Sequence, residues 1–370
     1  MSDPGVGFPV DEEPYAGPPP TLRPGPGAWQ QPAWLPPPVF PPPVVPGPPP
    51  VIRWAPPPGT PPHDVPQPFL LAMRSRDWGW WRPLLGLLLL GVVYVVAATV
   101  VVFLSLATGV GTDFAQLDLV DPPTLLLTNL SLIVAIPVVW LAWVVAHGMS
   151  RSWSSSVLAR LRWRLVLPYT LMALGTLGAG IALSVLAAFL LGEEEVTGPV
   201  ASIGWLLAVV VLTTPLQSAA EEYLFRGYLS QAIAGWVRRP LAGAVVAAVV
   251  TAALFSAAHL PPDVPTFLDR FAFGLAASAV VWLTGGLEAA IVLHAVNNVL
   301  VFVLAGVLGG GVATESAPDG SGWLSLLVGL LSVAAYVAVV GRSRRRLQPE
   351  RRTAAVDLGT PGMPVPIAAG

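Results

Sequence analysis

Residues 83–108 read PLLGLLLLGVVYVVAATVVVFLSLAT, a run of 26 residues without one charged side chain. A helix needs about 20 apolar residues to cross the roughly 30 Å of hydrocarbon in a bilayer, so this run predicts a membrane-spanning helix. Similar runs recur at residues 124–147, 165–191, 204–230, 242–260, 266–284, 287–308 and 323–341. We therefore predict an all-α, polytopic membrane protein with about eight transmembrane helices.

The composition supports a membrane protein and excludes several other classes. Of the 370 residues, 54% are hydrophobic and 11% are charged, an imbalance that excludes a water-soluble enzyme. The chain has no cysteine, so disulfides, thiolate nucleophiles and Cys-ligated zinc are excluded. The net charge of −2 is too small for bulk attraction to nucleic acid. The lipid bilayer is the expected partner.

Both ends of the chain differ from its centre. Residues 1–77 hold 26 of the 42 prolines and predict a disordered, extended arm without a conventional cleaved signal peptide. A simple spacer is favoured, and a segment that meets an aromatic-lined groove on a partner stays open. We expect three regions: the proline-rich arm at 1–77, the transmembrane domain at 78–341, and a basic, then flexible, tail at 342–370.

The basic residues, all arginine, sort by loop. They lie before the first predicted helix, between the second and third, after the fourth and after the eighth, whereas the alternate loops carry acids and no arginine. The positive-inside rule then places both termini in the cytoplasm, and an even number of helices agrees. We predict a multi-pass protein of the cell membrane.

Ionisable residues inside predicted helices concentrate in one window, residues 221–298. The fourth helix carries Glu221-Glu222-Tyr-Leu-Phe-Arg226, the fifth ends Phe-Ser-Ala-Ala-His259, and the seventh contains His294-Ala-Val-Asn-Asn298. Each ionisable group costs about 2.5 kcal/mol or more in hydrocarbon, so the cluster is a functional-site hypothesis. Glu288, near the start of the seventh helix, is expected to be solvated.

The residue types suggest individual roles. Glu222 and Arg226 lie one turn apart and can form an ion pair, which leaves Glu221 without a partner on its own helix and suited to act as a base. His259 and His294 can bind metal or orient water, and Asn298 can stabilise an oxyanion. The alternatives are a salt-bridged knot, histidines satisfied by neighbouring carbonyls, and an interhelical amide bond.

Together these three motifs resemble the CPBP family of intramembrane proteases, which includes type II CAAX-prenyl endopeptidases and bacteriocin self-immunity proteins. The resemblance covers about residues 165–341 as a protease-like core. It implies that Glu221 and His259 activate a water molecule, that His294 and Asn298 stabilise the oxyanion, and that Glu222 with Arg226 holds the glutamate in position. Zinc bound by Glu221, His259 and His294 is possible within this family; the sequence does not decide it.

The leading hypothesis is an endopeptidase that cleaves a membrane-associated peptide or protein substrate. A non-enzymatic scaffold or immunity protein is the alternative, in which the polar cluster only fixes helix packing. A proton-coupled transporter is a third hypothesis, disfavoured because the chain shows no internal repeat.

One part of the pattern fits imperfectly. His259 lies about 17 residues from the start of its predicted helix, and His294 only about 7 residues from the start of its own, although both helices start on the same side. For the two to meet, we expect residues 228–241 to form an interfacial helix, or the helices to tilt strongly.

Overall fold

The computed structural model describes residues 62–110, 118–191, 198–309 and 321–355. The chain divides into two units, residues 1–56 and residues 57–370, and every described residue belongs to the second unit. Residues 1–61 of the predicted proline-rich arm and residues 356–370 of the predicted tail lie outside the described residues. The fold below is that of the second unit.

The described residues contain eight helical spans long and apolar enough to cross a membrane, which confirms the predicted all-α fold. Their bounds are α1 (Arg82–Thr108), α2 (Pro122–Ile133) with α3 (Ala135–His147), α4 (Val166–Leu191), α5 (Ile203–Leu224) with α6 (Ser230–Val237), α7 (Pro240–Ala258), α8 (Val264–Thr284), α9 (Glu288–Leu308) and α11 (Ser321–Leu347).

Two spans are interrupted helices. Pro137 lacks the N–H that would donate to Ile133 O, and the helix breaks there at Val134, between α2 and α3. In the fourth span, a π-helical turn, Phe225–Leu229, joins α5 to α6. Such turns insert an extra residue into a helix and are frequent at functional sites.

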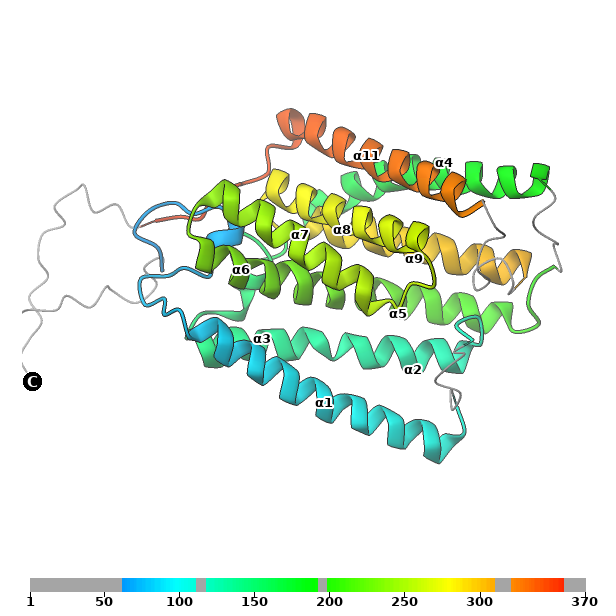
Figure 1. The fold of residues 1–370 in the computed structure, drawn as a ribbon, viewed down its shortest axis with the longest axis horizontal. Coiled ribbons are helices and arrows are strands. Elements are labelled where there is room, and N and C mark those ends of the chain that lie inside the picture. The colour runs from blue at the N-terminus through cyan, green and yellow to red at the C-terminus, as the bar shows by residue number, and fades with distance from the viewer. Residues whose placement is uncertain (1–61, 111–117, 192–197, 310–320, 356–370) are drawn as a thin grey trace, which may run out of the picture. The chain divides into compact units, whose positions relative to one another are not determined.

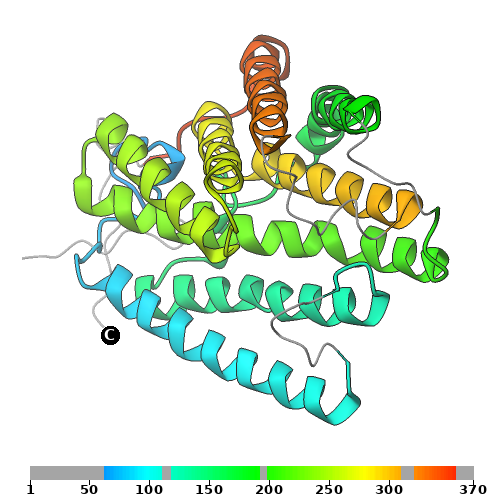
Figure 2. The ribbon, with the colours of Figure 1, turned by 45° about the vertical axis from the view of Figure 1, so that its right-hand side comes forward.

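The helix order places α5 and α9 at the centre. Figure 1 shows α1 along one side of the bundle and α4 with α11 along the opposite side. Helix α5 packs against α9, α2 and α3, while α7 packs against α8, and α8 against α9 and α11. The view in Figure 2 shows the same order, with α8, α11 and α4 seen nearly end-on. Of the three helices that carry the predicted site residues, α5 and α9 thus lie within the bundle, and α7 packs against α6 and α8 at its side (Figure 2).

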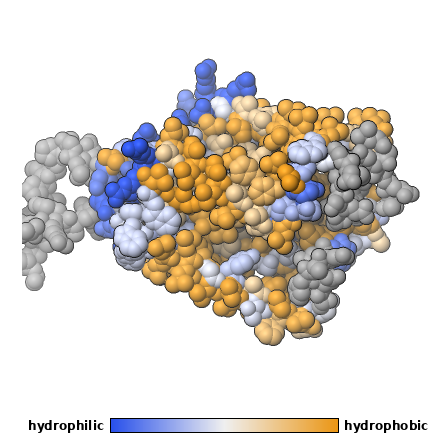
Figure 3. Space-filling view, in the orientation of Figure 1, coloured by the Kyte–Doolittle hydropathy of each residue, from blue (hydrophilic) through white to orange (hydrophobic). Residues whose placement is uncertain are grey.

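The outer faces of the helices are apolar. Large hydrophobic side chains of α1 such as Leu88 and Phe103 are more than 60% exposed, as expected for groups that face lipid. Figure 3 shows apolar side chains along the helices and hydrophilic ones gathered at one end, including the end of α11. We call this the arginine-rich end, because α1, α4 and α7 begin and α11 ends there beside arginines.

Segments from both ends of the described chain pack at the arginine-rich end. Residues 62–77, which we assigned to the arm, include the buried turn Phe69–Leu71, and Met73 N donates to Gln231 Oε1 of α6 at 3.1 Å. Thr353 N donates to Gln67 O at 2.8 Å, so residues that follow α11 lie beside residues that precede α1.

Of the two expectations for the register, the structure bears on the interfacial helix at residues 228–241, and a strong tilt of the helices stays a prediction. Residues 228–237 continue α5 through the π-helical turn and are largely buried, so they form no interfacial helix. Instead, α9 begins deep: Glu288 is 1% exposed, and Leu287 N donates to Ser155 O at 2.9 Å in the segment that covers the start of α9. With α9 starting in this buried position, His294 and His259 both lie within 4.0 Å of Glu221.

The expectation that Glu288 is solvated is wrong. Its carboxylate forms an ion pair with Arg162, at 2.6 Å between NH2 and Oε2, and both side chains are at most 2% exposed. Hydropathy places Glu288 at the start of a helix, a position that is usually exposed to water. It does not predict the contact with Arg162, which is 126 residues away in sequence.

Candidate active site

Three helices bring the six predicted site residues together. The end of α5 supplies Glu221 and Glu222, the residue after α7 is His259, and the second turn of α9 supplies His294, with Asn298 one turn further on. Arg226 lies in the π-helical turn that follows α5. The cluster predicted from sequence is thus a cluster in space.

Glu222 is the centre of a buried charge network. Arg226 NH1 donates to Glu222 Oε1 at 2.9 Å, and both side chains are fully buried. Arg226 NH2 also donates to Gly274 O of α8 at 2.9 Å. The predicted ion pair therefore forms, and it ties α5 to α8.

The same carboxylate orients His294. Nδ1 of His294 lies 3.0 Å from Glu222 Oε1. Because the carboxylate only accepts hydrogen bonds, we place the ring proton on Nδ1, which leaves a lone pair on Nε2. Phe255 and Phe273 pack edge-on against the ring at centroid distances of 5.6 and 5.4 Å and fix its plane.

Glu221 is held from one side only. Gln217, one turn earlier on α5, donates from Nε2 to Glu221 Oε1. Glu221 Oε2 is buried and has no hydrogen-bond partner among the described residues. A buried carboxylate oxygen without a donor is costly, so this atom has bonding capacity that the fold does not use.

His259 completes the group from the end of α7. The helix ends at Ala258, so His259 caps it and does not lie inside it as predicted. Its Nδ1 lies 2.7 Å from Phe255 O, a carbonyl acceptor, which again places the ring proton on Nδ1 and the lone pair on Nε2. About a third of the side chain is exposed, in contrast to His294.

Three lone pairs therefore converge. Glu221 Oε2 lies 4.0 Å from His259 Nε2 and 3.8 Å from His294 Nε2. All three atoms accept hydrogen bonds and none donates, so they repel one another unless a water molecule, a proton or a cation lies among them. A water there would donate to Glu221 Oε2 and to an imidazole, which is the arrangement that activates it as a nucleophile.

Asn298 lies beside this group. Its Nδ2 donates weakly to Gln217 Oε1 at 3.4 Å and to Ser218 Oγ at 3.5 Å. Because these hydrogen bonds are long, the amide can turn toward a stronger acceptor at small cost.

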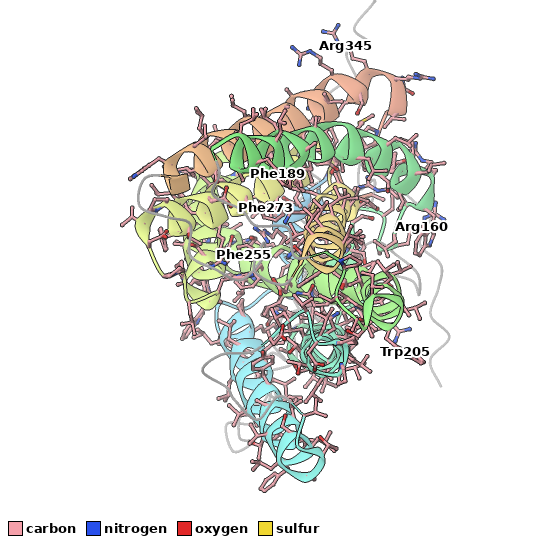
Figure 4. All side chains as sticks on the ribbon, turned by 90° about the vertical axis from the view of Figure 1, so that its right-hand side faces the viewer. Arg160, Phe189, Trp205, Phe255, Phe273 and Arg345 are labelled. Atoms are coloured by element: carbon pink, nitrogen blue, oxygen red, sulfur yellow. The ribbon has the colours of Figure 1, made fainter. Side chains whose placement is uncertain are left out.

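The group opens on a cavity of about 960 Å³. Glu221, His259, His294 and Asn298 line it, together with apolar side chains from α2, α4, α8 and α11. Figure 4 labels Phe255 and Phe273 in the interior of the bundle, whereas Trp205 and Arg345 point outward. A cavity of this size, largely apolar with a few convergent polar groups, is typical of a substrate site.

Glu221, His259 and His294 are the residues that could hold a zinc ion. One carboxylate and two imidazoles have the right chemistry, but their separations of 3.8 and 4.0 Å exceed the roughly 3.4 Å between ligands of a tetrahedral zinc ion. Among the described residues, no group of three or more histidine, aspartate and glutamate side chains is spaced to hold a metal ion. In this arrangement, the three donor atoms are too far apart to close around one zinc ion.

Sequence reasoning missed two kinds of site residue. Gln217 contacts both Glu221 and Asn298. Its spacing of four residues from Glu221 places both on the same face of the helix, and this spacing could have predicted the contact. Phe273 gave no signal, because an apolar residue in an apolar helix is indistinguishable from a lipid-facing one until the fold is known.

Comparison with known proteins agrees with this geometry. Residues 202–300 match the family described as type II CAAX prenyl endopeptidase Rce1-like. The uncharacterized protein YyaK of Bacillus subtilis (strain 168) is 31% identical over 100 residues, which are 25% of this chain and 32% of that protein. The match thus spans about a third of that relative's length. No solved structure matches the chain.

The residues matched by the family include every acid, imidazole and amide described above, from Gln217 to Asn298. The eight spans show, in addition, that the chain is a multi-pass membrane protein. Through its residues 202–300, the chain is therefore similar to the CAAX protease (CPBP) family, which is a family of peptidases.

Proposed function

We propose that this chain is an intramembrane endopeptidase that hydrolyses a peptide bond of a membrane-associated substrate with water activated by Glu221 and His259. The observation that carries the proposal is the convergence of three lone pairs, from Glu221 Oε2 and two Nε2 atoms, on a large cavity. A salt-bridged knot that only fixed helix packing would use its hydrogen-bonding groups, whereas Glu221 Oε2 is left without a partner.

The hydrolytic step uses these atoms in order. Water bound between Glu221 and His259 attacks the carbonyl carbon, forms the new C–O bond and gives a proton to Glu221 Oε2. The tetrahedral oxyanion accepts a hydrogen bond from Asn298 Nδ2. Glu221 then returns the proton to the leaving nitrogen as the C–N bond breaks and the C=O bond re-forms, which leaves a carboxylic acid and an amine; the proton of the acid then passes to the amine.

His294 has a more specific role in this scheme. Its Nδ1–H is directed to Glu222, so its Nε2 donates to the oxyanion only when the ring carries both protons. The carboxylate of Glu222 accepts the hydrogen bond that orients the ring, while Arg226 donates to the same carboxylate and holds it in place. Glu222 and Arg226 are thus positioning residues that act through His294.

The proposed substrate is a membrane-associated peptide or protein. The cavity has a mostly apolar lining with polar side chains from several helices, which suits an extended segment that presents one peptide bond to Glu221. We propose no prenyl group on it. The arginine-rich end is proposed to face the cytoplasm, together with both termini, following the distribution of arginines among the loops.

Zinc at Glu221, His259 and His294 stays a prediction from the family resemblance. Elemental analysis of the purified protein tests it: one zinc per chain in the wild type, lost in Glu221→Gln, would show that the donors close around the ion.

The decisive experiment compares Glu221→Gln with the wild type in cells of a strain that lacks the gene. Glutamine keeps the shape and the Gln217 contact but cannot take a proton, so membrane-associated substrates should accumulate uncleaved in the variant. Quantitative proteomics of the membrane fraction detects them. Asp121→Asn is the matched control, because Asp121 caps α2 outside the cavity and asparagine caps equally well.

The outcome separates the alternatives. Accumulation with Glu221→Gln and none with Asp121→Asn supports the peptidase. Full complementation by Glu221→Gln without any accumulating protein would show a scaffold or immunity protein. Flux driven by a pH gradient in proteoliposomes would show a transporter instead.

A further inference from the structure

A second charged feature lies at the arginine-rich end, outside the candidate active site. After α11 ends at Leu347, Gln348 adopts a left-handed backbone conformation with φ of 43°, and the chain turns back along the helix. This turn places Arg351 opposite the last turns of α11. Together they form a groove of about 790 Å³, lined by Ala338, Gly341, Arg342, Arg344, Arg345, Pro349 and Arg351.

The groove carries four guanidinium groups and no acid among its lining residues. Within the described residues, none of these four arginines forms an ion pair with a carboxylate. The nearest acid in sequence, Glu350, is already bound to Arg164 at 2.9 Å. Four like charges that share one groove repel one another, so an anion bound there would be stabilised strongly.

The groove is a built feature of the fold. Pro349 is buried, and Arg162 NH1 donates to Glu350 O at 2.7 Å, which fixes the returning chain. Arg164 NH1 donates to Leu347 O at 2.8 Å and ties the first residues of α4 to the end of α11. The arginines of α11 and of the returning chain are therefore held opposite each other by hydrogen bonds that do not use them.

The position of the groove identifies the source of the anion. Trp163, next to the Arg164 contact, is 73% exposed at the start of the α4 span. Exposed tryptophans at span ends mark the level of the lipid headgroups. Arg345 points away from the bundle at the end of α11, as Figure 4 shows, and so reaches outward at this level.

We propose that this groove binds the phosphate group of an anionic phospholipid headgroup. Guanidinium groups bind phosphate oxygens in pairs, and basic clusters directly beside a membrane helix select anionic lipids. The bound headgroup also holds the returning chain against the loop before α9, because Gly285 lies directly against Glu350 O and Arg351 Cα. The inference does not depend on the proposed peptidase activity.

The test measures binding of soluble short-chain lipid to the purified full-length protein. The probes are dihexanoyl phosphatidylglycerol, dihexanoyl phosphatidylcholine and sodium phosphate, each titrated by calorimetry in the same detergent. The groove variant is Arg342→Gln/Arg345→Gln/Arg351→Gln. The control is Arg160→Gln/Arg238→Gln/Arg239→Gln, which removes the same charge from exposed positions at the same end.

We expect the wild type to bind phosphatidylglycerol and neither of the other probes. The groove variant should lose affinity about 100-fold and the control less than about threefold. Equal losses in the two variants, no loss in either, or equally tight binding of sodium phosphate would each overturn the proposal. If the groove variant is not monodisperse on gel filtration, Arg351→Gln alone carries the test, with an expected loss of about fivefold.

Discussion

Two ion pairs, Glu222–Arg226 and Arg162–Glu288, are almost equally buried. They differ in how many of their polar atoms have a hydrogen-bond partner. Arg162 donates to both oxygens of Glu288 and also to Thr284 O, and no buried polar atom of either residue lacks a partner. Around Glu222, by contrast, Glu222 Oε2, Arg226 Nε and the neighbouring Glu221 Oε2 have no hydrogen-bond partner in the described part of the chain. The complete pair is expected to fix structure, whereas the proposed function assigns the incomplete one to the site of hydrolysis.

The difference extends to the surroundings. The Arg162–Glu288 pair is enclosed by Gly286, where an added Cβ would collide with Arg162 NH2 and Glu288 Oε2. Burial opposes the charge of Arg162, but the hydrogen bonds and the charge of Glu288 outweigh it and raise the pKa of Arg162. Glu221 instead faces a cavity of about 960 Å³. The candidate site thus differs from the Arg162–Glu288 pair in two ways: it has polar atoms without a hydrogen-bond partner among the described residues, and it lies beside a cavity.

The largest effect is expected at Glu221. Glu221→Gln should reduce cleavage about 10³-fold, because the water loses its base. The melting temperature should stay level or rise, since the substitution removes a buried charge that repels two imidazole lone pairs. Thermal unfolding followed by tryptophan fluorescence measures the second part. A fall of more than a few degrees would mean that Glu221 is a structural group like Glu288.

The opposite pattern is expected at Glu288. Glu288→Gln leaves the buried Arg162 with only the partly exposed carboxylate of Glu350, 3.5 Å away, as a counter-charge and should cost about 3 kcal/mol of stability. The melting temperature should fall by several degrees. The double variant Arg162→Gln/Glu288→Gln removes both charges and keeps amide donors for Thr284 O and Glu350 O, so it should be less destabilised than the sum of the two single variants. Strict additivity of the two single losses would contradict the pairing.

A smaller effect is expected at Glu222. Glu222→Gln keeps an acceptor for His294 Nδ1–H but loses the charge that Arg226 holds in place, so the ring is oriented less firmly and turnover should fall about 10- to 100-fold. The fall should lie in kcat, with KM unchanged, because Glu222 does not line the cavity. Rates are measured on the substrate that accumulates with Glu221→Gln. A change confined to KM would contradict the assignment of Glu222 as a positioning residue.

The smallest effect on stability is expected at Glu350, which contacts Arg162 of the Arg162–Glu288 pair. Although partial burial opposes it, hydrogen bonds from its own backbone and from Arg164 lower the pKa of Glu350. A lowered folded-state pKa contributes stability above the unfolded value and loses it as the pH falls. Hydrogen exchange at Thr353 should therefore accelerate between about pH 5 and pH 3. In Glu350→Gln, the exchange rate should show no such transition after correction for intrinsic exchange.

Local patterns were sufficient for much of this molecule. The eight spans follow from hydropathy, and the meeting of Glu221, His259 and His294 follows from the scarcity of ionisable groups in hydrocarbon. The partners that could not be predicted are distant ones. Nothing in the sequence links Arg162 to Glu288, or Gln67 to Thr353, because such pairings depend on how deep each helix starts. Gln217 lay within reach of prediction, since it repeats the one-turn spacing of the other site pairs.

The hydrogen bond from Arg162 to Glu350 O has a consequence for biosynthesis. The start of α9, six residues before His294, is secured by residues that leave the ribosome after all eight spans have been made. Hydrophobic insertion can thus be finished while the imidazole of α9 is still unsupported. A nascent chain released before residue 350 would reach the bilayer with its full set of helices and without the contact that supports the helix of His294.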